Sequence, residues 1–152
     1  MIKKTLVIFT LFILLLLGLF STSNFEQLIV VQPNNHAKKP IDMIPNRYKD
    51  RFCNMTIADI NHSSQAILPN GDTLFFDDVG CLVLWLQTQP IPTEIVLWIW
   101  AKDGAKYIPA QEAWYARHEK TPMSYGFGAY QQKKPDYINF TAMQKRVENA
   151  KY

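Results

Sequence analysis

The sequence predicts an α+β fold in which two small strand–turn–strand–helix units pack together behind an N-terminal signal or anchor helix. Two turn signals support this prediction, Asn70-Gly71 and Asp103-Gly104, because each lies between short apolar stretches and each second stretch is followed by a helix signal. An apolar run opens the chain, and an amphipathic pattern begins near Asn139. The 152 residues suffice for one compact domain.

The first 23 residues have the order of a secretory signal, basic residues followed by hydrocarbon. Lys3 and Lys4 precede an apolar run that extends to Phe20, and Ser21-Thr22-Ser23 supplies small residues for cleavage. If the signal is not cleaved, residues 5–20 would anchor the chain in the inner membrane, with the basic end inside. The sequence therefore predicts a periplasmic protein.

Residues 24–46 are predicted to be a tether, because Pro33, Pro40 and Pro45 interrupt regular structure. Its short apolar run over residues 28–31 could add an edge strand. Residues 47–152 are then the folded domain. Without residues 1–23 the chain keeps 14 basic and 13 acidic residues, so its net charge falls from +3 to +1. This balance excludes nucleic acid as the expected partner.

The first predicted unit begins with a strand over residues 52–60, which would place Cys53 and Met55 on the same face. Residues 65–68 and 73–76 are predicted to form a hairpin around the Asn-Gly turn. Asp77 or Asp78 then caps a helix over residues 79–86, which is apolar on every side and therefore buried.

The second predicted unit has strands over residues 95–101 and 106–108, joined by the Asp-Gly turn. Pro109 suits the first position of a helix, which is expected to run to about His118. The glycine-broken segment 125–130 is expected to be an irregular strand or a loop. A last helix starts near Asn139, and one of its faces carries the apolar residues Phe140, Met143, Val147 and Ala150.

Three sulfur-containing side chains are the candidate metal ligands. Cys53 and Met55 offer a thiolate and a thioether, and Met123 follows Pro122, which fixes the local backbone. Soft ligands of this kind favour Cu(I). His118 is a weaker candidate, because a histidine at the end of a helix also interacts well with the helix dipole. Packing in the core is the alternative role for all three sulfur side chains.

The two cysteines leave a second interpretation open. In an exported chain Cys53 and Cys81 could form a disulfide, which would make the protein a disulfide-closed structural or interaction protein of the envelope. No Cys-x-x-Cys, Ser–His–Asp order or nucleotide loop is visible in the sequence. Helix capping accounts for Asp77 and Asp78 without a catalytic role. We therefore expect a protein that is not an enzyme.

Taken together, four motifs resemble those of the NosL family, the nitrous oxide reductase accessory proteins. The motifs, which span roughly residues 41–130, are Cys53-Asn54-Met55, Phe75-Phe76-Asp77-Asp78-Val79-Gly80-Cys81, Thr121-Pro122-Met123 and the segment from Gly126 to Ala129. Two positions depart from the family pattern. The chain lacks the lipidation cysteine usual in the family, and Asn54 replaces the glycine of the Cys-Gly-Met motif.

The resemblance implies a periplasmic Cu(I) metallochaperone built from two similar α+β units. Cys53, Met55 and Met123 match the sulfur positions of the family motifs, so the resemblance makes them the expected ligands. It also implies two partners, a copper-recipient enzyme such as nitrous oxide reductase and a membrane transporter complex.

Overall fold

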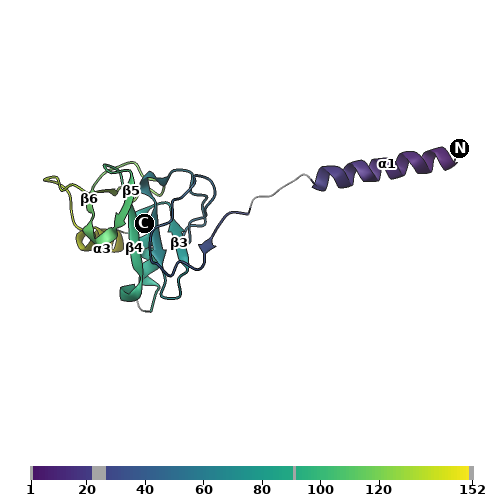
Figure 1. Cartoon of the computed structure of the whole chain (residues 1–152). Coiled ribbons are helices and arrows are strands. Elements are labelled where there is room, and N and C mark those ends of the chain that lie inside the picture. The colour runs from purple at the N-terminus through teal and green to yellow at the C-terminus, as the bar shows by residue number, and fades with distance from the viewer. Residues whose placement is uncertain (1, 22–26, 91, 151–152) are drawn as a thin grey trace.

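The computed structural model describes residues 2–21, 27–90 and 92–150, and within them the chain is α+β (Figure 1). In chain order, the helices and strands are α1 (Ile2–Ser21), β1 (Val31–Gln32), β2 (Ser64–Ile67), β3 (Thr73–Phe76), α2 (Val79–Gln87), β4 (Val96–Ala101), β5 (Lys106–Pro109), β6 (Trp114–Ala116), β7 (Gly128–Tyr130) and α3 (Phe140–Asn149). Short 3₁₀ turns cover Ile60–His62, Pro92–Glu94 and Ala110–Glu112.

Five strands form one antiparallel sheet in the order β1-β3-β2-β4-β5, and β6 pairs with β7 separately. Alternate side chains of the large sheet enter two different cores, as the twofold period of a strand requires. Leu74 and Phe76 pack with α2 and α3 in the larger core. Phe75 packs on the other face, against side chains such as Met43 and Ile57 from the segment before β2. The sheet is therefore covered by helices on one face and by loops on the other.

Several predicted elements are confirmed. β2 and β3 form the predicted hairpin, and Gly71 takes the positive φ of 91° that its turn requires. Asp78 caps α2, and its side chain accepts a hydrogen bond from the N–H of Gly80. Asn139 caps α3, and Phe140, Met143 and Val147 are buried as expected. Ala150, expected on the same face, is the exposed C-cap of α3.

The strand predicted over residues 52–60 is wrong. Residues 51–53 form a tight turn, and Asn54 has a positive φ of 64°. A side chain overrides the strand pattern here, because the Asp50 carboxylate accepts hydrogen bonds from the N–H groups of Phe52 and Cys53. Cys53 and Met55 therefore do not alternate along a strand.

The helix predicted from Pro109 to His118 is also wrong. Only a 3₁₀ turn follows β5, and the chain then extends into β6. Tyr115 fixes this course, since its backbone pairs with Ala129 and with Ile138 and its buried hydroxyl donates to the carbonyl oxygen of Ala110. The second hairpin is thus followed by a strand, whereas the first is followed by a helix.

The segment predicted as a tether contributes to the domain where it is described. Val31 of β1 pairs with Leu74 of β3, Gln65 exchanges hydrogen bonds with the backbone of Ile41, and Met43 is buried. Residues 22–26 lie outside the described residues, and with them Thr22 and Ser23 of the predicted cleavage segment.

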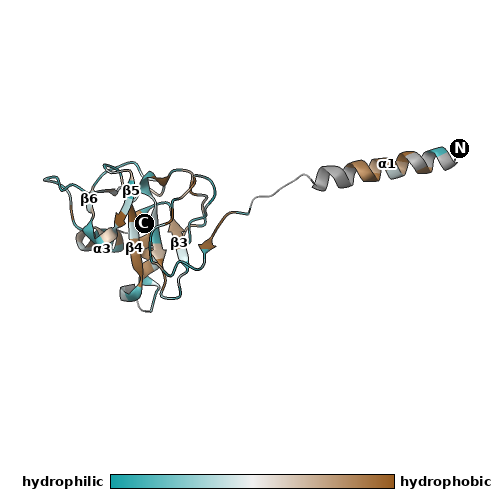
Figure 2. Ribbon diagram, in the orientation of Figure 1, coloured by the Kyte–Doolittle hydropathy of each residue, from teal (hydrophilic) through white to brown (hydrophobic). Residues whose placement is uncertain are grey.

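Helix α1 lies apart from the domain in Figure 1. Its described apolar residues are exposed, among them Leu6, Phe9 and Leu14. Figure 2 colours the described apolar part of this helix brown for hydrophobic residues. Among the described residues, no helix combines the length and the apolar character that crossing a membrane requires.

Candidate metal centre

Two carboxyl and two thiol side chains converge beside the start of α2. One potential ligand atom from each of Asp50, Cys53, Asp77 and Cys81 lies within 4.8 Å of the other three. Asp50 and Cys53 come from the tight turn, Asp77 from the connection between β3 and α2, and Cys81 from the first turn of α2. Asp50 and Cys81 are fully buried, Asp77 is 3% exposed, and Cys53 is partly exposed. The cluster is therefore a buried site with one side chain that solvent reaches.

Asp50 holds the turn against the sheet. Its Oδ1 accepts hydrogen bonds from the N–H groups of Phe52 at 2.6 Å and Cys53 at 2.8 Å, and its Oδ2 accepts one from the N–H of Asp77 at 2.8 Å. These N–H groups compensate for burying the carboxylate. Asp50 therefore fixes Cys53 and Asp77 relative to each other without any metal ion.

The acidic groups oppose one another's ionisation. Burial raises the pKa of Asp77 to about 7, and the neighbouring Asp50 and Asp78 contribute to this rise. Burial likewise raises the pKa of the Cys53 thiol to about 11 and the pKa of the Cys81 thiol far above its ordinary value. The Sγ of Cys53 lies 3.9 Å from Oδ1 of Asp77. Without a cation, the two thiols therefore keep their protons at neutral pH.

Two thiols and two carboxylates can act together as a metal-binding group. Thiolates are the protein ligands that Cu(I) and Zn(II) prefer, and a bound cation lowers the pKa of a coordinating thiol until it loses its proton. The arrangement therefore supports binding of a metal ion.

The predicted ligands have different positions. Cys53 belongs to the cluster. Met55 follows the tight turn, and its side chain is 48% exposed. Met123 is partly buried against the larger core, which Cys53 also contacts. His118 is exposed on the loop after β6, has a positive φ of 67°, and is not a member of the four-residue cluster.

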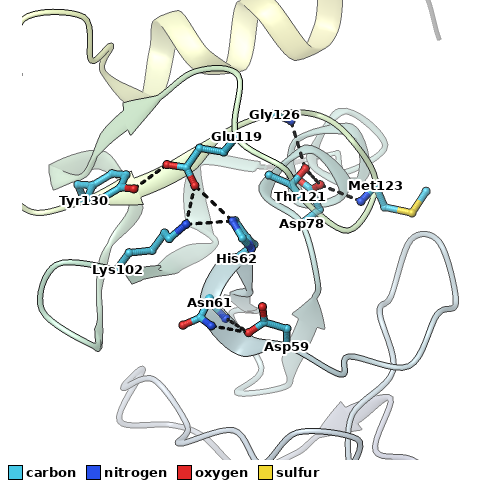
Figure 3. Close-up of polar contacts among 10 residues, drawn as sticks. All are labelled: Asp59, Asn61, His62, Asp78, Lys102, Glu119, Thr121, Met123, Gly126 and Tyr130. Carbon is cyan, nitrogen blue, oxygen red and sulfur yellow. Dashed lines mark hydrogen bonds and ion pairs between the residues drawn. The ribbon is translucent and has the colours of Figure 1, made fainter.

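The loop that carries Met123 is tied to the start of α2 by Asp78. Oδ2 of Asp78 accepts hydrogen bonds from the Thr121 hydroxyl at 2.6 Å and from the N–H of Met123 at 3.1 Å. Thr121 in turn accepts one from the N–H of Gly126 (Figure 3). The Met123 side chain extends away from Asp78 in this view. Since Asp78 follows Asp77 directly, the Met123 loop is fixed to a neighbour of the cluster.

Three of the four clustered groups were not predicted as ligands from the sequence. Cys81 was considered only as a disulfide partner, Asp77 only as a helix cap, and Asp50 not at all. A signal for two of them was present, because Asp77 comes just before the predicted helix and Cys81 lies in its first turn, so both are near the helix start. Nothing in the local pattern indicated that Asp50 would fold back onto this helix.

Comparison with known proteins gave no relative, since no family model, curated protein or solved structure matches the chain. The resemblance to the NosL family therefore stays a prediction from the motif residues.

Proposed function

We propose that the domain binds Cu(I) through the thiolates of Cys53 and Cys81 and passes the ion to a partner protein. The observation that carries this proposal is the convergence of both thiols with two carboxylates within 4.8 Å. Cu(I) is favoured over Zn(II) because thioethers accompany the thiols: Met55 lies two residues after Cys53, and Met123 is on the loop tied to α2.

The burial of the two thiols suits transfer by ligand exchange. Cys81 is fully buried, whereas Cys53 is partly exposed and is followed by the exposed Met55. An incoming ligand of a partner would reach the ion from the side of Cys53. Both thiols must lose a proton on binding. Asp77 is placed to accept the proton of Cys53 once a bound cation has lowered the pKa of that thiol, because its Oδ1 lies 3.9 Å from the Cys53 Sγ.

The proposal includes the cellular setting that the NosL resemblance implies. The chain is exported by residues 1–23 or held at the inner membrane by residues 5–20, and it acts in the periplasm. It supplies copper for a cuproenzyme such as nitrous oxide reductase together with a membrane transporter complex. Ligand exchange involves no turnover chemistry, so the protein is not an enzyme under this proposal.

A competition titration of the reduced protein against a chromophoric Cu(I) chelator tests the proposal. We expect one high-affinity Cu(I) per chain. Because loss of an outer partner of a metal ligand already costs about 10–100-fold in affinity, Cys53→Ser and Cys81→Ser should each weaken binding by more than about 100-fold. Met143→Leu, a buried thioether in α3, is the control and should bind as the wild type does. Wild-type affinity in both serine variants would refute the proposal.

The same geometry favours one rival function. Both cysteines are free thiols, and their sulfur atoms lie within the 4.8 Å cluster, so a small movement would allow a disulfide. The protein would then be a disulfide-closed structural or interaction protein of the envelope. A thiol count on protein purified without reductant separates the two, since two free thiols favour the copper site and none favours the rival.

A further inference from the structure

A cavity separate from the metal cluster lies between the segment 117–127 and the C-terminal end of α3. It is a cavity of about 360 Å³, a volume at the lower end of the range for small-molecule sites. Three basic side chains line it, with apolar and small residues between them; the full lining is Arg117, His118, Glu119, Ser124, Tyr125, Gly126, Phe127, Arg146 and Ala150.

Glu119, the acidic residue of this lining, has its carboxylate engaged elsewhere. Oε2 accepts hydrogen bonds from Lys102 at 2.6 Å and from His62 at 3.4 Å, and Oε1 accepts one from the Tyr130 hydroxyl at 2.6 Å. Figure 3 shows the carboxylate directed toward these three side chains. Burial alone would raise the pKa of Glu119, but the hydrogen bonds from Lys102 and Tyr130 outweigh it and lower the pKa. Its charge is thus balanced by Lys102.

Arg117 lines the cavity and is partly buried. Its Nε is buried and has no hydrogen-bond partner among the described residues. A planar guanidinium binds carboxylates and phosphates through two parallel hydrogen bonds, which makes an oxyanion the fitting acceptor. Arg146 lines the same cavity and is exposed, so it can contribute a second guanidinium.

We propose that this cavity binds the oxyanion group of a small organic acid, a carboxylate or a phosphate ester. Arg117 and Arg146 bind the oxyanion, and the apolar part of the ligand packs against Tyr125 and Phe127. The cavity shares no residue with the Asp50–Cys81 cluster, so this proposal does not depend on copper binding.

Isothermal titration of the full, metal-free chain with three aromatic probes tests the proposal. Benzoate and phenyl phosphate carry the two oxyanions, and benzyl alcohol is the neutral analogue. We expect at least one of the anions to bind and the alcohol not to bind. The anion that binds more tightly identifies the preferred group. Equal binding of the alcohol, or binding of none of the probes, would overturn the proposal.

Two substitutions distinguish specific binding in the cavity from nonspecific attraction of anions to the basic surface. Arg146→Gln, at an exposed position that need not affect folding, should weaken binding of the preferred anion about 10-fold or more, as the loss of a charge-assisted hydrogen bond predicts. Lys120→Gln removes the same charge from an exposed residue outside the cavity and should change the affinity less than about 2-fold. Equal losses in both variants would show only an electrostatic background and would overturn the assignment.

Discussion

Replacement of Asp77 by asparagine should make the metal-free protein more stable at pH 8 than the wild type. The carboxyl is 3% exposed, and burial together with Asp50 raises its pKa from 3.8 to about 7. A carboxyl with a raised pKa favours the folded state while it is protonated. Its contribution is fully present below about pH 4 and is lost as the pH rises through about 7. An asparagine side chain would keep the shape of the aspartate and carry no charge to bury.

The size of the effect follows from the pKa shift. A change of about three units corresponds to about 4 kcal/mol at 1.36 kcal/mol per unit. We halve this value to about 2 kcal/mol, because solvent reaches the cluster at the partly exposed Cys53 and screens part of the charge. The variant and the wild type should therefore have similar stability near pH 4 and differ by about 2 kcal/mol near pH 8.

Urea unfolding of both proteins in reductant and chelator, from pH 4 to pH 8, measures this difference. The wild type should lose stability across the range relative to Asp77→Asn. Asp72→Asn, in the β2–β3 turn, is the matched control and should follow the wild type. Parallel pH profiles for Asp77→Asn and the wild type would refute the reasoning, since they would show that Asp77 is ionised in the folded cluster at no cost.

Two further predictions concern the loop that carries Met123. Asp78→Ala should lower the free energy of unfolding by about 3 kcal/mol, because it removes a helix cap and the acceptor for Thr121 and Met123; denaturant unfolding measures this loss, and Asp59→Ala, at an exposed 3₁₀ cap, should cost less than about 1 kcal/mol. Met123→Leu should weaken Cu(I) binding roughly 10-fold and leave Zn(II) binding unchanged, because thioethers favour Cu(I); equal changes for both ions in competition titrations would exclude Met123 as a ligand.

The elements that the sequence predicted well are those whose signals are local. Asn70-Gly71 specifies its own turn, and Asp78 and Asn139 cap their helices with their own side chains. The apolar stretches 96–101 and 106–109 also form strands close to the predicted bounds. Each of these features depends on residues a few positions apart, which is the range that pattern reasoning covers.

The two predictions that were wrong, the strand over residues 52–60 and the helix after Pro109, concern segments whose local structure is decided by residues distant in the sequence. The 52–60 pattern alternates as a strand would, yet the Asp50 carboxylate captures two N–H groups of the turn and the N–H of Asp77, which is 27 residues away. The predicted helix after Pro109 gives way to β6, because β7 and Ile138 supply partners from later in the chain. The metal cluster escaped prediction for the same reason, since its members come from the turn after Asp50 and from the start of α2, which are distant in the sequence.

Charge balance bears on which ion the cluster would hold. Two thiolates around Cu(I) leave the complex with one negative charge. The Asp50 carboxylate can stay ionised beside it, because three backbone N–H groups donate to its oxygens. An ionised Asp77 would add a further buried charge at a higher cost. Asp77, with a pKa of about 7, can remain protonated beside such a complex. A divalent ion would compensate one more charge and would favour the ionised form of Asp77. Asp77→Asn should therefore weaken binding of Zn(II) more than binding of Cu(I), so the charge state of this one carboxyl distinguishes the two metals.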